Sequence, residues 1–115
     1  MTAGTYLITA EQGATFTRTI VWKDSAGVPV DLTGYTARMQ VREDYFSTVA
    51  ELTLTTANGK ITLGGVTGSI VLNVSATDMA LLQANSYVYD LELEIGGVVT
   101  RLIQGTFTVN AEVTR

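Results

Sequence analysis

Three acidic side chains stand at alternate positions in the last third of the chain, at Asp90, Glu92 and Glu94. Alternate residues of a β-strand point to one face, where neighbouring carboxylates are about 6.6 to 6.8 Å apart. Two carboxylates in that range suit acid–base hydrolysis or hold a hard cation. We favour the simpler reading, a solvated outer face on which Arg101 offsets part of the repulsion and the carboxylates discourage edge-to-edge pairing.

A second polar row comprises Arg38, Gln40 and Arg42, together with Thr36. Guanidinium and amide groups in such a row suit recognition of a carboxylate, a sugar or an acidic neighbour. The alternative, that the row is only the wet face of a strand, stays open at this point. Because two of the chain's five arginines lie here, the row is our first candidate for a protein contact surface.

Two aromatic residues, Tyr45 and Phe46, fall in a segment over residues 43–48 that has the composition of a loop. Such residues either fold back as a packed loop tip or meet a partner. In a chain that assembles with copies of itself they are good candidates for binding hot spots. We therefore add them to the candidate contact residues.

Composition excludes several kinds of chemistry. The chain has no Cys and no His, which rules out disulfides, thiolate ligands and cysteine nucleophiles and removes the commonest general base. We therefore predict no catalytic residue, no cofactor and no metal site, and a protein that is not an enzyme. The formal net charge of −4, with seven scattered basic residues, argues against nucleic-acid binding.

The first ten residues contain neither a basic stretch nor a long apolar one, so no signal peptide is expected. No apolar run approaches the roughly 20 residues that a membrane-spanning helix needs, and no membrane association is expected. We expect synthesis and folding in a cytoplasm.

The segments that carry the candidate side chains are predicted to be β-strands. Charged residues make up only 16% of the chain, and nineteen residues are Thr, a β-branched type that suits either face of a sheet. Strand signals recur every eight to twelve residues with turn residues between them, as in a sandwich. We predict an all-β antiparallel sandwich of about seven to nine strands over residues 13–115, with residues 1–12 as an N-terminal arm or edge strand.

The expected strands cover residues 6–9, 14–23, 35–42, 50–55, 60–63, 70–74 and 87–95, with a last strand after residue 98. Arg18 interrupts the apolar face of the second, which we explain by a place where that strand leaves the core. Asn58-Gly59 predicts a tight turn after which residues 60–63 pair back on residues 50–55. A Ser75-to-Asp78 capping box predicts one short helical turn near residues 76–83.

The final hairpin is predicted in register. Gly96-Gly97 makes a two-residue turn that places Glu92 opposite Arg101 and Glu94 opposite Val99. The inward-facing positions then change parity between Leu102 and Phe107. A bulge must absorb this change, and we place it at Gly105.

With these strands in place, the sequence resembles a group of small immunoglobulin-like β-sandwich virion proteins of tailed bacteriophages, similar to the N-terminal domains of baseplate upper proteins. The segments that carry the resemblance are GATFTRTIVWKDSAGVPVDLTGYTARMQVR (Gly13 to Arg42), GSIVLNVSATD (Gly68 to Asp78), YVYDLELEI (Tyr87 to Ile95), RLIQGTFTV (Arg101 to Val109) and the ending EVTR. Together they span nearly the whole chain. The group has no catalytic residues to carry over.

The resemblance implies a structural role in a virion: a multi-copy adaptor subunit of the tail, baseplate or fibre that binds copies of itself and other virion proteins. Because the sequence stops after one domain, we expect a separate assembly subunit rather than part of a fused fibre. Residues 1–11 could dock by adding a strand to a partner sheet. A host-glycan-binding module and a capsid decoration protein remain the alternatives.

Overall fold

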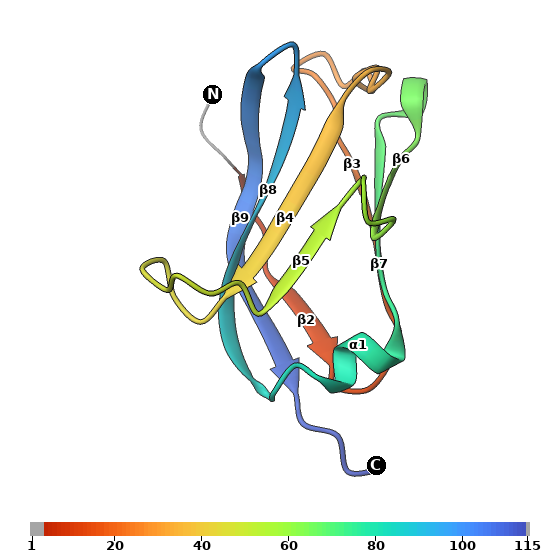
Figure 1. Cartoon of the computed structure of the whole chain (residues 1–115). Coiled ribbons are helices and arrows are strands. Elements are labelled where there is room, and N and C mark those ends of the chain that lie inside the picture. Colours follow the sequence, from red (N-terminus) through yellow and green to blue (C-terminus); the bar gives the residue numbers. More distant parts are fainter. Residues whose placement is uncertain (1–3, 115) are drawn as a thin grey trace.

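The computed structural model describes residues 4–114 and arranges them as two packed β-sheets (Figure 1). The larger sheet has six strands in the order β1-β9-β8-β4-β5, with β2 also paired to β9, and the smaller has the order β3-β7-β6. The strands are β1 (Gly4–Thr5), β2 (Ile8–Glu11), β3 (Phe16–Val21), β4 (Thr36–Arg42), β5 (Leu52–Thr55), β6 (Ile61–Leu63), β7 (Ser69–Val74), β8 (Asn85–Ile95) and β9 (Val98–Asn110). The predicted all-β sandwich is confirmed.

The core lies between the two sheets because apolar residues alternate with polar ones along the strands. In β4, Ala37, Met39 and Val41 are buried while their neighbours are not, as the alternation predicts. An aromatic cluster joins the sheets: the ring of Phe107 in β9 meets Phe16 of β3 at 5.5 Å and Tyr89 of β8 at 6.3 Å, both edge to face.

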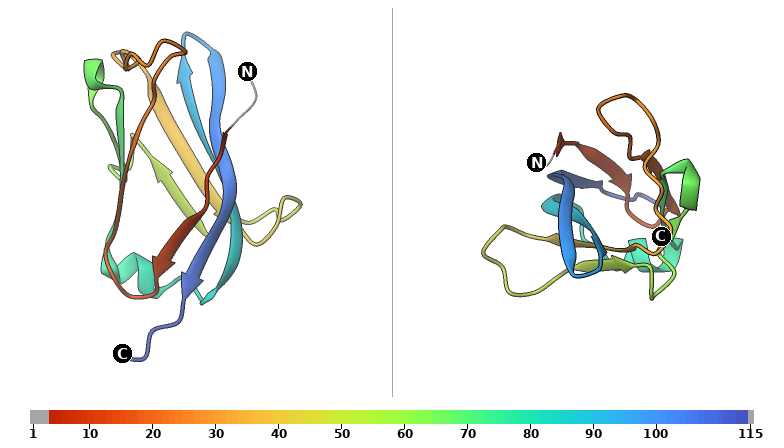
Figure 2. Two further views of the ribbon diagram at one scale, coloured as in Figure 1. Left: turned by 180° about the vertical axis from the view of Figure 1, so that it is seen from behind. Right: turned by 90° about the horizontal axis from the view of Figure 1, so that it is seen from above.

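The N-terminal segment belongs to the larger sheet. Both β1 and β2 pair with β9 in parallel, the exception to an otherwise antiparallel pairing (Figure 2). With β9, β8, β4 and β5 on one sheet and β3, β7 and β6 on the other, the strand order is immunoglobulin-like, and both N-terminal strands join the larger sheet. Residues 4–11 are therefore paired within the chain itself, and residues 1–3, like residue 115, lie outside the described part.

Arg18 closes the seam between the two sheets. Its Nη1 donates to the Tyr6 hydroxyl at 2.7 Å, and its guanidinium lies 5.8 Å from the Tyr6 ring centre and 5.6 Å from that of Phe16. A charged residue on an inward-pointing position is tolerated here because the guanidinium lies over two ring faces at the open edge of the sandwich.

The predicted pairing of residues 60–63 is wrong. These residues form β6 and pair with β7 of the smaller sheet, not with β5. The chain passes from the larger sheet to the smaller one between β5 and β6. Asn58 stabilises this connection, because its Oδ1 accepts from the N–H groups of Thr55 and Lys60, both at 3.0 Å, so the turn needs no hydrogen bonds between β5 and β6. The alternation of apolar and polar residues predicts that Ile61 faces the core, but it does not predict which of the two sheets its strand joins.

The register of the β8–β9 hairpin is confirmed, with Glu92 opposite Arg101 and Glu94 opposite Val99. The predicted place of the bulge is wrong. Leu91 pairs with Ile103 and Glu92 with Arg101, so the extra residue of β9 is Leu102. Gly105 lies in regular register opposite Tyr89 and is needed for another reason: a Cβ there would lie 2.5 Å from the Tyr6 carbonyl oxygen.

The turn between β7 and β8 contains the predicted helix, α1 (Ala76–Ala80), which starts where Ser75 Oγ accepts from the Asp78 N–H at 3.2 Å. The Tyr87 hydroxyl donates to the Gln83 carbonyl at 2.6 Å, a tyrosine corner of the kind found at this position of immunoglobulin-like sandwiches. A short 3-10 helix, η1 (Gly65–Thr67), was not predicted. Within residues 4–114, no helix is long and apolar enough to cross a membrane.

Candidate functional site

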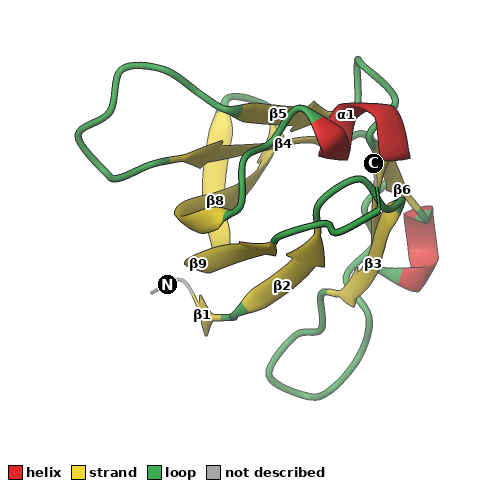
Figure 3. Ribbon diagram, turned by 90° about the horizontal axis from the view of Figure 1, so that it is seen from below, coloured by secondary structure: helices red, strands yellow, loops and turns green. Residues whose placement is uncertain are grey.

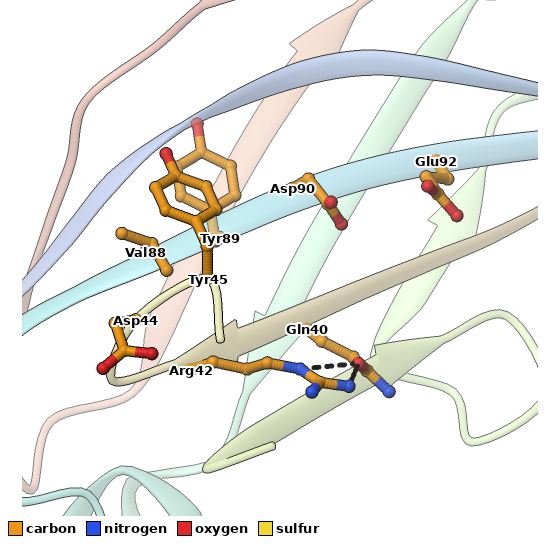
Figure 4. Close-up of a pocket in the computed structure, with 8 residues that line it drawn as sticks. All are labelled: Gln40, Arg42, Asp44, Tyr45, Val88, Tyr89, Asp90 and Glu92. Atoms are coloured by element: carbon orange, nitrogen blue, oxygen red, sulfur yellow. Dashed lines mark hydrogen bonds between the residues drawn. The ribbon is translucent and has the colours of Figure 1, made fainter. Parts of the chain in front are cut away.

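The outer face of the larger sheet brings the two polar rows together. Strand β4 pairs with β8 so that Arg38 faces Glu92 and Gln40 faces Asp90. Where β4 ends, the connecting loop over residues 43–51 leaves the sheet, and its first residues border an open groove of about 290 Å³ (Figure 4). The groove is lined by Gln40, Arg42, Asp44, Tyr45, Val88, Tyr89, Asp90 and Glu92.

Ion pairs within the chain neutralise much of this surface. Arg38 holds Glu92 at 2.9 Å and Glu94 at 3.1 Å, and Arg101 lies 3.4 Å from Asp90 and 3.6 Å from Glu92. The two carboxylates beside Arg38 raise the pKa of its guanidinium. Exposed pairs of this kind add little stability. They do keep the arginines and carboxylates in fixed positions, so Arg38 is less available to a partner than the sequence suggested.

Asp90 is the group whose ionised form fits this surface least well. Partial burial in the groove, and secondarily the charge of Glu92, raise the pKa of its carboxyl above 3.8, against the opposing effects of Arg101, Arg42 and Arg38. A raised pKa means that the unfolded chain holds ionised Asp90 more easily than the folded chain does. The stability linked to this group is therefore present at low pH and is lost as the pH rises through its folded pKa.

We expect the variant Asp90→Asn to unfold at a slightly higher temperature than the wild type at pH 7. The gain should vanish well below pH 3.8, where Asp90 is protonated and resembles the amide. Thermal unfolding followed by circular dichroism at both pH values measures this difference. A loss of stability at pH 7 would show instead that the ion pair with Arg101 outweighs the burial of the carboxylate.

Arg42 has a different role from Arg38. Its Nε and Nη2 donate to Gln40 Oε1 at 3.2 and 2.7 Å (Figure 4). Its Nη1 donates to the Ser47 carbonyl at 2.5 Å. No carboxylate within residues 4–114 forms an ion pair with it. Arg42 therefore ties the loop back to β4 and brings into the groove a positive charge that has no direct ion-pair partner among the described residues.

The loop over residues 43–51 is further braced from within. Asp44 Oδ1 accepts from the Phe46 N–H at 2.9 Å, and the Ser47 N–H donates to the Asp44 carbonyl at 3.3 Å. The Glu51 N–H donates to the Val41 carbonyl at 2.8 Å and closes the base of the loop. Loops braced in this way lose less conformational entropy when they bind.

This braced loop presents both aromatic rings to solvent. Figures 1 and 2 show it projecting well clear of the two sheets. Tyr45 is 69% exposed and Phe46 94% exposed, so neither ring packs as the tip of a folded-back loop. Tyr45 lines the groove, whereas Phe46 does not.

The sequence identified Gln40, Arg42 and Tyr45 as candidates, and all three line the groove. It missed Asp44 and Val88 as parts of the same site. Val88 carried a usable signal, because it shares the outward parity of Asp90 in β8. Asp44 carried none, since its position depends on the direction in which the loop leaves β4.

No protein-family model matches this chain, and no curated protein shows a significant match to it. What the site can bind is therefore inferred from its own geometry. Within residues 4–114, no group of three or more acidic side chains is arranged to hold a metal ion. The site thus consists of two parts. One is the braced loop with its two exposed aromatic rings, and the other is the groove at its base, which is lined by both hydrogen-bond donors and acceptors.

Proposed function

We propose that the chain is a non-enzymatic structural protein of a bacteriophage virion, a multi-copy adaptor subunit of the tail, baseplate or fibre. It acts through protein–protein contacts made by the loop over residues 43–51. The observation that carries this proposal is the 94% exposure of Phe46 at the tip of a loop braced by hydrogen bonds. The resemblance of the sequence to virion sandwich proteins supports the virion part of this proposal.

The physical argument concerns the cost of such a ring. Leaving a phenylalanine side chain in water forfeits roughly 1.5 to 3 kcal/mol of burial free energy. Exposed aromatic rings on preorganised loops are typical of binding hot spots, where a partner covers the ring and excludes water. The loop therefore fits an anchor for another protein better than a structural part of its own sandwich.

The test is the copy number of the protein in purified particles of the phage that encodes it, measured by quantitative mass spectrometry. We expect several copies per particle and clearly fewer in Phe46→Ser, because loss of about 2 kcal/mol or more at a hot spot weakens binding more than tenfold. Leu81→Ser is the matched control, since Leu81 is 80% exposed but lies on the turn after α1.

Two results would contradict the proposal. Absence of the protein from particles that contain the other tail and head components would overturn the virion role. Unchanged copy number in Phe46→Ser, or an equal loss in Leu81→Ser, would overturn the role of the loop. Imaging of labelled particles then distinguishes a tail or baseplate position from capsid decoration, in which the same contacts would hold shell subunits together.

A second candidate function, recognition of a neutral host glycan, is favoured by the groove itself. Tyr45 offers an exposed ring beside the Arg42 guanidinium, the Gln40 amide and the Asp44 and Asp90 carboxylates. Sugar hydroxyls both donate and accept hydrogen bonds, and sugar rings stack on aromatic faces. Binding to a glycan array that Tyr45→Ala abolishes and Phe46→Ala leaves intact would favour this function over assembly.

A further inference from the structure

One edge of the larger sheet is formed by β5, which ends the strand order beside β4 (Figures 1 and 3). The Thr56 N–H donates to the Ala37 carbonyl at 3.1 Å, so these two residues form a hydrogen-bonded pair that continues the β4–β5 ladder. Hydrogen-bonded pairs alternate along an antiparallel ladder with pairs that exchange no hydrogen bonds. Thr53 and Thr55 therefore turn their backbone N–H and C=O groups away from β4, toward the edge where another strand could add.

The side-chain amide of Asn58 occupies this edge. The Thr55 N–H donates to Asn58 Oδ1 at 3.0 Å, and Asn58 Nδ2 donates to the Thr53 carbonyl at 3.0 Å. A residue of a neighbouring parallel strand makes the same two bonds with its backbone, one to the C=O before and one from the N–H after the residue it faces. The Asn58 amide thus takes the place of one backbone residue opposite Leu54.

The turn after β5 holds this amide in position. Asn58 Oδ1 also accepts from the Lys60 N–H at 3.0 Å, and the Asn58 N–H donates to Thr55 Oγ1 at 2.9 Å. Gly59, at φ 80°, takes a left-handed conformation that favours glycine and lets the chain turn toward β6. An incoming strand would have to break the bonds of the amide before it could pair with β5.

Two edges of the smaller sheet are protected by other means. Strand β6 is only three residues long, and β3 carries the charged Arg18 on its inward side. Short strands and inward-pointing charges are both common ways to discourage pairing between sheet edges. The sequence of β5, Leu-Thr-Leu-Thr, contains neither a charged residue nor a proline, so protection of this edge depends on the Asn58 amide.

We propose that the Asn58 side chain is an edge cap, which closes β5 to strand addition and excludes the β5 edge of a second copy. When the cap is removed, two β5 strands pair antiparallel about a two-fold axis, with Thr53 of each copy opposite Thr55 of the other. That pairing joins the larger sheets of two copies. The inference is independent of the proposed function, because it concerns a sheet edge and not the loop over residues 43–51.

Sedimentation velocity tests the cap in proteins that also carry Phe46→Ser, so that contacts through the loop do not contribute. With Asn58 intact, we expect the monomer mass of 12.3 kDa at all concentrations. Asn58→Ala removes both capping atoms and should give concentration-dependent dimers. Asn58→Asp keeps the oxygen that accepts from Thr55 but loses the donor to Thr53, so it should dimerise more weakly than Asn58→Ala.

A second substitution shows whether the dimers form through β5. Thr53→Pro removes an N–H that points away from β4, a position where an edge strand accepts proline. Added to Asn58→Ala, it should restore the monomer. Hydrogen exchange at low protein concentration adds a local measurement: the Thr55 amide should exchange about tenfold faster in Asn58→Ala and keep its protection in Asn58→Asp.

Asn73→Ala is the matched control, since Asn73 is also exposed but lies in β7, the central strand of the smaller sheet. It should stay monomeric, and circular dichroism establishes that each variant is folded. A folded Asn58→Ala that stays monomeric overturns the edge cap, as do dimers that Thr53→Pro leaves intact or that Asn73→Ala forms equally well. If Asn58→Ala does not fold, a monomeric Asn58→Asp overturns it. None of these outcomes changes the copy number expected for Phe46→Ser in particles, so the proposed function stands or fails separately.

Discussion

Truncation of Phe107 to alanine is expected to lower the free energy of unfolding by about 3 to 5 kcal/mol, a large part of the stability of a domain this size. The side chain is fully buried, and its ring meets Phe16 of one sheet and Tyr89 of the other. Its removal leaves a cavity between the two sheets that the surrounding strands cannot fill. Urea denaturation of the wild type and of Phe107→Ala, compared where both have the same dependence of unfolding free energy on urea concentration, measures the loss.

Phe46→Ala is the matched control for this prediction. The same atoms are removed, but from a ring that is 94% exposed, so the change in stability should stay within about 0.5 kcal/mol. The pair of variants separates the two roles of phenylalanine in this chain. An equal loss in both would show that Phe46 packs against the body in solution, which would also weaken its assignment as a binding anchor.

Gly105→Ala is expected to destabilise the protein by about 1 to 3 kcal/mol, although it adds a single methyl group. The added Cβ would lie 2.5 Å from the Tyr6 carbonyl oxygen and 3.2 Å from the carbonyl carbon, both atoms of the backbone. The segment between β1 and β2 must therefore move away from β9. That movement also breaks the hydrogen bonds from the Tyr89 hydroxyl to the Tyr6 carbonyl and from the Tyr6 N–H to the Gln104 carbonyl.

Gly4→Ala provides the comparison, since its Cβ would meet no atom closer than 3.7 Å in the same pair of strands. Its effect on the free energy of unfolding should be below about 0.5 kcal/mol. Hydrogen exchange adds a local measurement: in Gly105→Ala the amide of Tyr6 should exchange faster while the amides in the middle of β4 keep their protection. Equal stability of the two variants would show that the N-terminal strands shift aside without cost.

These expectations also indicate what the N-terminal segment does. The Tyr6 N–H donates to the Gln104 carbonyl of β9, and the Tyr6 carbonyl accepts from the Tyr89 hydroxyl. The Tyr6 hydroxyl accepts from Arg18, which belongs to the other sheet. Residues 4–11 thus close one side of the sandwich. The described N-terminal strands already pair with β9 in their own sheet, and the exposed loop over residues 43–51 offers a separate surface for contacts.

Local chemistry determined which way each side chain points. Successive residues of a strand face opposite sides, so the alternation along β4 and β8 identified the buried and exposed residues before any strand was paired. Two more features were predicted because their causes lie within a few residues. The Gly96-Gly97 turn sets the hairpin register, and the Ser75 side chain starts α1.

Tertiary structure decided which strands meet, because pairing between distant segments depends on contacts that no local pattern encodes. It placed β6 on the smaller sheet, joined β1 and β2 to β9 in parallel, and moved the bulge to Leu102. It also set the polar row of β4 beside the carboxylates of β8, which neutralised Arg38 and left Arg42 to brace the loop. The sequence alone located the groups with chemistry, and the long-range pairing of β4 with β8 determined which of them a partner can reach.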